Sequence, residues 1–198
     1  DFVLTGTCTT SFQTSGANRS NNIVVGASRL NNLIVMPGQT VSVSDTILPR
    51  TRANGYKEAG VYVNGAHTTG LGGGVCQISS TVYNAVKNAG LTVVQRNPHS
   101  MPVNYLPKGL DAAIAAGSKD LKFRNDYTTP VVLYTDTSNK HLTVNVLVWN
   151  QELAGRSFKL WAKQTGALSA DTLRPIRMAK KSARSLSAPP AIIPTAKQ

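Results

Sequence analysis

Residues 70–86, GLGGGVCQISSTVYNAV, place three consecutive glycines directly before an amphipathic segment that carries a cysteine at its start. Apolar residues recur at helical spacing from Val75 to Ala89, and Gly90 is suited to end a helix there. Glycines leave the backbone amides unobstructed, and the first turn of a helix has amides without intrahelical partners. The sequence therefore predicts a helix whose start a ligand can approach closely.

The hydrophobic patterns predict an α+β fold, with a mixed or antiparallel sheet, two main helices and a basic C-terminal appendage. The first helix is expected to start at Ser20 as its N-cap and to continue to Ile34, and the second starts at Val75. An Asn64-Gly65 pair predicts a hairpin turn. Alternating residues predict strands at residues 5–12, 39–48, 61–63, 91–96, 111–118, 130–137 and 141–149.

We expect one domain over residues 1–150, followed by a basic, partly flexible extension over residues 151–198. The formal charge is +12, and the extension holds nine Lys/Arg against two Asp/Glu. Such a surface attracts anions, and anionic wall polymers are one candidate for the extension. Because few aromatic residues accompany the basic ones, nucleic acid is a poor candidate. Phe158, Leu160 and Trp161 are expected to dock on the domain or on a partner, and no apolar run is long enough for a transmembrane segment.

Cys76, at the start of the second helix, is the candidate nucleophile. Helix-start amides and the helix dipole stabilise a thiolate, and the same amides can receive an oxyanion. Attack on an amide carbonyl needs both features and also a proton carrier for the leaving amine. Two alternatives stay open for Cys76, a disulfide with Cys8 and a buried structural thiol.

His99 is the candidate proton carrier, because it lies in the Pro-bounded loop PHSMP, where a fixed backbone can aim the imidazole. Asp111 is the candidate third member that orients His99. The alternatives are a surface histidine and an aspartate that serves a turn. Substrate-binding candidates near these residues are Gly72, Gly73, Gly74, Gln77, Ser79, Ser80, Ser100, Tyr105 and Arg50. The sequence has no zinc-type Cys/His spacing, so we expect no metal and no cofactor.

Two strings of the chain, GLGGGVCQISSTVYNA and RNPHSMPVNYLPKGLDAAI, resemble the VanW family, and the resemblance extends over about residues 10–150. It implies an extracytoplasmic protein of mainly Gram-positive bacteria, related to an accessory member of vancomycin-resistance clusters. It further implies L,D-transpeptidation, in which the motif cysteine, here Cys76, takes an acyl group from a peptidoglycan stem and passes it to an amine of a neighbouring stem.

The leading hypothesis is therefore a monomeric, cell-wall or secreted cysteine acyltransferase that acts on peptidoglycan stem peptides. A noncatalytic cell-wall or glycopeptide-resistance accessory module is the main alternative, in which the glycine turn holds a peptide carboxylate and Cys76 is structural. Hydrolysis by a papain-like or NlpC-type Cys/His peptidase is the third, and it differs in using water as the acyl acceptor.

Overall fold

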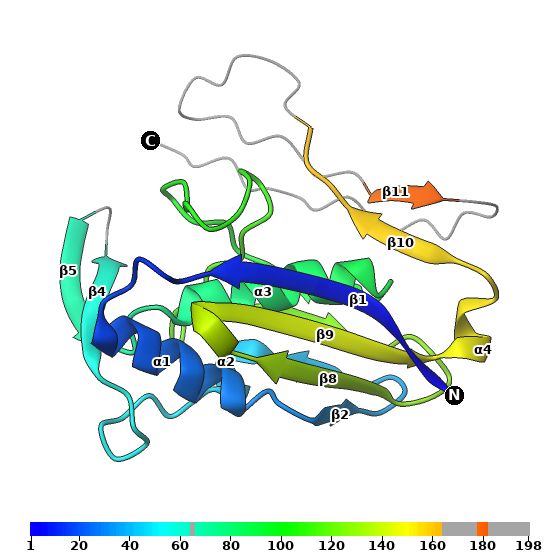
Figure 1. Ribbon diagram of the computed structural model, residues 1–198, viewed down its shortest axis with the longest axis horizontal. Coiled ribbons are helices and arrows are strands. Elements are labelled where there is room, and N and C mark those ends of the chain that lie inside the picture. The colour runs from blue at the N-terminus through cyan, green and yellow to red at the C-terminus, as the bar shows by residue number, and fades with distance from the viewer. Residues whose placement is uncertain (64–65, 164–177, 182–198) are drawn as a thin grey trace.

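The computed structural model describes residues 1–63, 66–163 and 178–181, and it has the α+β class predicted from the sequence (Figure 1). The helices are α1 (Ala17–Ser28), α2 (Val43–Thr46), α3 (Val75–Asn88), α4 (Asn150–Leu153) and a 3-10 turn η1 (Ser138–Lys140). The strands are β1 (Phe2–Ser11), β2 (Leu33–Val35), β3 (Thr40–Ser42), β4 (Glu58–Val63), β5 (Ala66–Leu71), β6 (Thr92–Gln95), β7 (Lys122–Arg124), β8 (Val131–Asp136), β9 (His141–Trp149), β10 (Ser157–Leu160) and β11 (Met178–Lys181). None of the described helices is long and apolar enough to span a membrane.

The larger sheet is antiparallel, with the strand order β1-β9-β8-β2. Strands β1 and β9 pair along their whole lengths, from Phe2 opposite Trp149 to Ser11 opposite His141. Alternate residues of β9 are fully buried, namely Leu142, Val144, Val146 and Val148. This period of two turns one face of the sheet toward the helices, and the predicted hairpin of β8 and β9 is confirmed.

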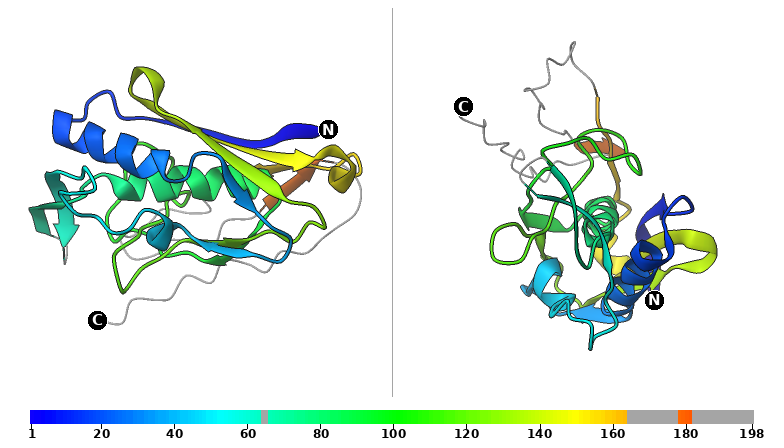
Figure 2. Two further views of the ribbon diagram at one scale, coloured as in Figure 1. Left: turned by 90° about the horizontal axis from the view of Figure 1, so that it is seen from below. Right: turned by 90° about the vertical axis from the view of Figure 1, so that its left-hand side faces the viewer.

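Helix α3 runs through the centre of the molecule, between two sheets (Figure 2). It packs against β1 and β9 of the larger sheet and against β6 of an antiparallel sheet with the order β3-β7-β6. Twelve of its fourteen residues are buried, so its polar side chains need partners inside the protein. Thr81 Oγ1, for example, lies 2.8 Å from Oγ1 of Thr10 in β1.

Strand β1 touches α3 most closely at Gly6. A Cβ at this position would lie 2.1 Å from the carbonyl oxygen of Ala85 and 2.6 Å from the amide nitrogen of Ala89. The register between β1 and β9 also shifts between Leu4 and Gly6. Only a residue without a side chain allows the strand and the helix to approach this closely.

The first helix is shorter than the sequence predicted. It ends at Ser28, and Asn32 then adopts a left-handed conformation with φ of 58°, which turns the chain into β2. The apolar spacing that predicted a longer helix continues across this turn and so did not reveal it. The predicted N-cap was also wrong, because the N-cap is Gly16 and Ser20 lies inside α1.

The predicted strand at residues 39–48 is correct only in its first half. Strand β3 ends at Ser42, whose hydroxyl accepts a hydrogen bond from the Asp45 amide at 3.0 Å and so caps the short helix α2. The hairpin predicted around Asn64-Gly65 is present, since β4 and β5 pair with each other. The two turn residues themselves lie outside the described residues.

The C-terminal segment packs on the domain through β10, which pairs with β11. The Phe158 ring covers Gly90 at the end of α3, where a Cβ would lie 2.5 Å from the ring, and Leu160 is buried. The predicted docking of these two side chains is confirmed. The flexibility predicted after about Arg184 and the anion binding predicted for the tail fall mainly on residues outside those described.

The contact at Gly6 yields a stability prediction. A Gly6→Ala substitution should lower the free energy of unfolding by about 1–3 kcal/mol, because the added methyl group forces β1 away from α3. Chemical denaturation measures this change. Thr7→Ala is the matched control, because Thr7 is exposed on the same strand, and it should cost about 0.5 kcal/mol. Equal stability of the two variants would contradict the packing argument.

Candidate active site

Residues 72–74 form the tight turn between β5 and α3. Gly72 and Gly74 have φ angles of 81° and 112°, which L side chains rarely adopt. A Cβ on Gly73 would lie 2.6 Å from the carbonyl oxygen of Gly60 in β4. Close packing therefore accounts for these glycines by itself, and their contact with a substrate stays a prediction.

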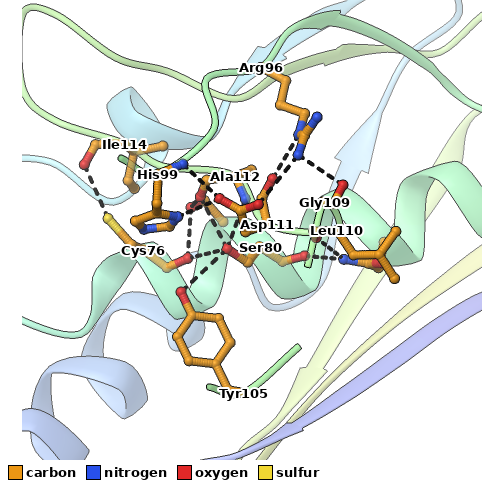
Figure 3. Close-up of polar contacts among 12 residues, drawn as sticks. Cys76, Ser80, Arg96, His99, Tyr105, Gly109, Leu110, Asp111, Ala112 and Ile114 are labelled. Carbon is orange, nitrogen blue, oxygen red and sulfur yellow. Dashed lines mark hydrogen bonds and ion pairs between the residues drawn. The ribbon is translucent and has the colours of Figure 1, made fainter. Parts of the chain in front are cut away.

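Cys76 lies in the first turn of α3 and is a free thiol, as is Cys8 in β1. The alternative of a disulfide between them is therefore wrong. Cys76 Sγ donates a hydrogen bond to the carbonyl oxygen of Ile114 at 3.3 Å (Figure 3). Cys8 packs against the core opposite Val144 of β9, where burial raises its pKa to about 11.

His99 lies between Cys76 and Asp111 (Figure 3). Its Nδ1 is 2.7 Å from Asp111 Oδ2, and its backbone N–H donates to the same oxygen at 2.7 Å. These two contacts fix the backbone and the imidazole ring of His99, and they leave its other ring nitrogen, Nε2, free to interact with the thiol. The structure thus brings the three predicted catalytic residues together.

Arg96, which the sequence analysis did not single out, holds Asp111 from the other side. Its Nε donates to the backbone oxygen of Asp111 at 2.7 Å, and Nη2 donates to the Gly109 oxygen at 3.0 Å. Nη2 also lies 3.5 Å from Asp111 Oδ1, and the two side chains are only 6% and 9% exposed. The guanidinium covers the Tyr83 ring at 4.8 Å from its centroid. These contacts fix the carboxylate and favour its charged form.

The charges of the site shift one another's pKa values. Burial raises the pKa of Cys76, but hydrogen bonding with His99 and the charges of His99 and Arg50 lower it more. Burial lowers the pKa of His99, but its hydrogen bonds with Asp111 and Cys76 outweigh this and raise the pKa to about 9. The opposite net shifts favour the pair of thiolate and imidazolium over the pair of neutral groups.

An extended segment, residues 109–114, lies along α3 and is attached by helix side chains. The hydroxyls of Ser79 and Ser80 both donate to the carbonyl oxygen of Ala112, whose amide donates back to Ser80 Oγ at 2.9 Å. The strand predicted at residues 111–118 was therefore wrong. Side chains of α3 form the hydrogen bonds with the segment's backbone that a neighbouring strand would otherwise form. The segment forms only the isolated bridges Asn97–Ala113 and Ala115–Lys119.

The other substrate-binding candidates are placed differently. Tyr105 reaches the site, with its hydroxyl 3.5 Å from Ser80 Oγ, and burial raises the pKa of this tyrosine. Arg50 packs its side-chain stem on Gly72, and Ser100 is exposed in the loop after His99. Within the described residues, no three His, Cys, Asp or Glu side chains are grouped to hold a metal ion.

Gln77 faces away from the thiol, because successive residues of a helix point in directions about 100° apart. It is 1% exposed, and its amide nitrogen donates to Thr10 Oγ1 at 3.0 Å and to the Ser11 carbonyl at 2.9 Å. Its oxygen accepts from Arg19 Nη2 at 2.8 Å. Arg19 precedes Ser20 in a polar stretch, and its distance in sequence from Gln77 gave no sign that the two would form a hydrogen bond.

The comparisons with known proteins identify the family. The family described as VanW like protein matches residues 18–147. The chain belongs to this family. Among curated VanW-like relatives, an uncharacterized protein YoaR of Bacillus subtilis (strain 168) is 42% identical over 128 residues, which cover 65% of this chain and 42% of that protein.

A second relative, the vancomycin B-type resistance protein VanW of Enterococcus faecalis (strain ATCC 700802 / V583), is 35% identical over 114 residues, 55% of this chain and 42% of that protein. The chain thus matches less than half the length of both relatives. No solved structure matches the chain.

The pKa shifts predict how Cys76 reacts with iodoacetamide. Because its pKa is lowered, alkylation should persist at pH 7, below the usual thiol pKa of about 8.5. Replacing His99 with Ala leaves burial to raise the Cys76 pKa, so the rate at pH 7 should fall about tenfold or more. Peptide mass mapping measures both cysteines at once, and Cys8 should stay unmodified.

His141→Ala is the control, because the His141 imidazole contacts the backbone oxygen of Asn139, in the turn before β9, at 2.9 Å. It should leave the pH profile of Cys76 alkylation unchanged. A wild-type rate that begins to rise only above pH 8 would refute the lowered pKa.

The contact between His99 and Asp111 predicts a histidine titration. Asp111→Asn removes the carboxylate charge that Nδ1 contacts, so the His99 pKa should fall from about 9 toward its usual value near 6.5. NMR titration of the imidazole carbons measures it. Asp126→Asn, which removes an exposed carboxylate paired with Arg124, should leave the His99 pKa in place. An equal His99 pKa in all three proteins would contradict the assignment.

Proposed function

We propose that this chain is the acyl-transfer unit of an extracytoplasmic cell-wall enzyme, with Cys76 as nucleophile, His99 as proton carrier and Asp111 as the residue that orients His99. One observation carries the proposal, the 2.7 Å contact of His99 Nδ1 with Asp111 beside a free thiol at a helix start. A thiolate, a protonated imidazole and a fixed carboxylate are the groups that acyl transfer through a thioester requires.

In the first step, the Cys76 thiolate attacks the carbonyl carbon of a stem-peptide amide. A carbon–sulfur bond forms, the carbon–nitrogen bond breaks, and the His99 imidazolium gives its proton to the departing amine. In the second step, an amine of a neighbouring stem attacks the thioester. Its proton passes to His99, the new amide is released, and the thiolate is restored.

The oxyanion of the tetrahedral intermediate needs hydrogen-bond donors close to the sulfur. At the helix start, the Val75 and Gln77 amides already donate to the carbonyl oxygens of Gly72 and Gly74. Within the described part of the chain, the amides of Gly74 and Cys76 donate to no acceptor. These two amides are therefore the proposed oxyanion donors.

Peptidoglycan stem peptides are the proposed substrates, and two considerations support them. One VanW relative is described as a vancomycin B-type resistance protein. The resemblance of the cysteine motif to the family also implies L,D-transpeptidase-type chemistry. Because both relatives extend well beyond the matched part, the reaction is assigned only to the unit that carries Cys76.

Intact-mass measurement tests the proposal. Wild-type protein incubated with a synthetic tetrapeptide stem should gain the mass of the tripeptide acyl group and release the terminal amino acid. Cys76→Ala should gain nothing, while Cys8→Ala, which keeps the site, should behave as wild type. Equal mass change in wild type and Cys76→Ala would refute acyl transfer.

The fate of the acyl group separates transfer from hydrolysis. With a second stem as the amine acceptor, the cross-linked dimer should form in preference to the free tripeptide. Free tripeptide as the main product would instead assign a peptidase. A wild-type protein that stays unmodified while binding stems would assign a noncatalytic wall-binding module.

A further inference from the structure

Two arginines pack on the glycine turn that leads into α3. The Cγ atom of Arg19, in α1, lies 3.0 Å from the position that a Cβ on Gly74 would take. The Cδ atom of Arg50, in the loop after α2, lies 3.0 Å from the corresponding position on Gly72. Both side chains therefore lie against the turn that precedes Cys76 in the chain.

The guanidinium of Arg19 is held in place by neutral groups. Nη1 donates to Ser15 Oγ at 2.6 Å, and Nη2 donates to Oε1 of Gln77, the residue that follows Cys76. These bonds fix the direction of the group without neutralising its charge. An immobilised and partly desolvated arginine of this kind is suited to bind a planar anion.

The acidic side chains near the site already form ion pairs with other cationic side chains. The ion pairs among the described residues are Arg52–Glu58, Arg96–Asp111, His99–Asp111 and Arg124–Asp126. Neither Arg19 nor Arg50 takes part in any of them. A partly buried cation without a carboxylate partner is costly, and an anionic ligand would relieve that cost.

The electrostatic interactions of the two arginines extend to the reacting sulfur. Burial lowers the pKa of Arg19, while the charges of Tyr105 and Cys76 raise it in part. The charge of Arg50 contributes to lowering the pKa of Cys76. Because both arginine stems pack on the turn that leads into Cys76, and Arg19 bonds the next residue, Gln77, an anion bound by them would lie beside the start of α3.

We propose that Arg19 and Arg50 form a carboxylate-binding subsite that receives the free C-terminal carboxylate of the residue that leaves the acyl donor. This inference rests on the proposed function, and it adds a specificity. In a stem that is cleaved before its last residue, one carbon separates the departing nitrogen from the carboxylate. The subsite would therefore select the terminal peptide bond over internal ones.

The first test uses two small alkylating agents and needs no peptidoglycan substrate. Iodoacetate carries a carboxylate next to its reactive carbon, and iodoacetamide is its neutral counterpart. The ratio of their rates at Cys76 cancels changes in thiol reactivity. Arg19→Gln and Arg50→Gln should each lower the iodoacetate-to-iodoacetamide ratio about tenfold at low salt, a change that corresponds to about 1.4 kcal/mol.

Three variants control this measurement. Arg52→Gln removes the same charge from the same loop but from an exposed arginine paired with Glu58, so the ratio should stay at the wild-type value. Arg19→Lys keeps the charge and should restore most of the ratio, which also separates the effect from misfolding. Gln77→Leu removes the acceptor of Arg19 and should lower the ratio through loss of its orientation. A ratio that is equal in wild type, Arg19→Gln and Arg50→Gln overturns the subsite.

The second test places the carboxylate on the donor. Wild-type Cys76 should be acylated about tenfold faster by a tetrapeptide stem than by the same stem with a C-terminal amide, and Arg19→Gln should remove this preference. A preference that instead follows amidation of a side-chain carboxylate overturns the assignment to the C-terminus. If the alkylation ratio responds but no stem acylates Cys76, the subsite stands and the proposed function fails.

Discussion

The enclosure of α3 is the constraint on which the rest of the structure depends. This helix lies between two sheets and is buried over twelve of its fourteen residues, yet five of those twelve are Gln, Ser, Thr or Asn. Buried hydroxyls and amides must find partners. Strand β1 supplies some of them, and the segment 109–114 supplies the others.

That segment is attached to the helix at every second residue. Asn84 donates to the oxygen of Leu110, the two serines donate to that of Ala112, and the Cys76 thiol donates to that of Ile114. In an extended chain, the residue between such contacts points the other way. Asp111 is that residue: its backbone oxygen accepts from Arg96, and its carboxylate contacts His99. The hydrogen-bonding needs of a polar core helix thus position a carboxylate that the helix itself does not touch.

The charges of the site alternate in sign along a chain of contacts, from Arg96 through Asp111 and His99 to Cys76. Each ion removed from water loses solvation, and only a partner of opposite sign compensates for that loss. A change at one member therefore shifts the proton affinity of the next, so Asp111, His99 and Cys76 titrate as a unit. This coupling explains why burial, which alone raises the Cys76 pKa, does not decide the outcome.

Local patterns predicted α3 and the β8–β9 hairpin correctly. They also singled out Cys76, His99 and Asp111, which the structure brings together, while the catalytic roles of these residues stay a prediction. Arg19 had no such local signal, since its role comes from a contact with Gln77, far along the chain, and Arg96 had no sequence feature that marked it beyond its charge. The error at residues 111–118 is similar, because an extended segment has the same pattern whether a strand or a helix takes its hydrogen bonds. Gln77 follows the cysteine in the motif, but helix geometry directs it to the opposite side.

The glycines before Cys76 show that a sequence motif alone does not distinguish a packing role from a catalytic one. The absence of a side chain at Gly73 allows β4 to approach, and at Gly72 and Gly74 it makes room for the stems of Arg50 and Arg19. A side chain at any of the three would displace a segment that packs on the turn before Cys76, so lost activity in such a variant would not separate packing from chemistry. Substitutions of Asp111, Arg50 and Arg19 act on charge at the end of a side chain. They are therefore better probes of what the site recognises.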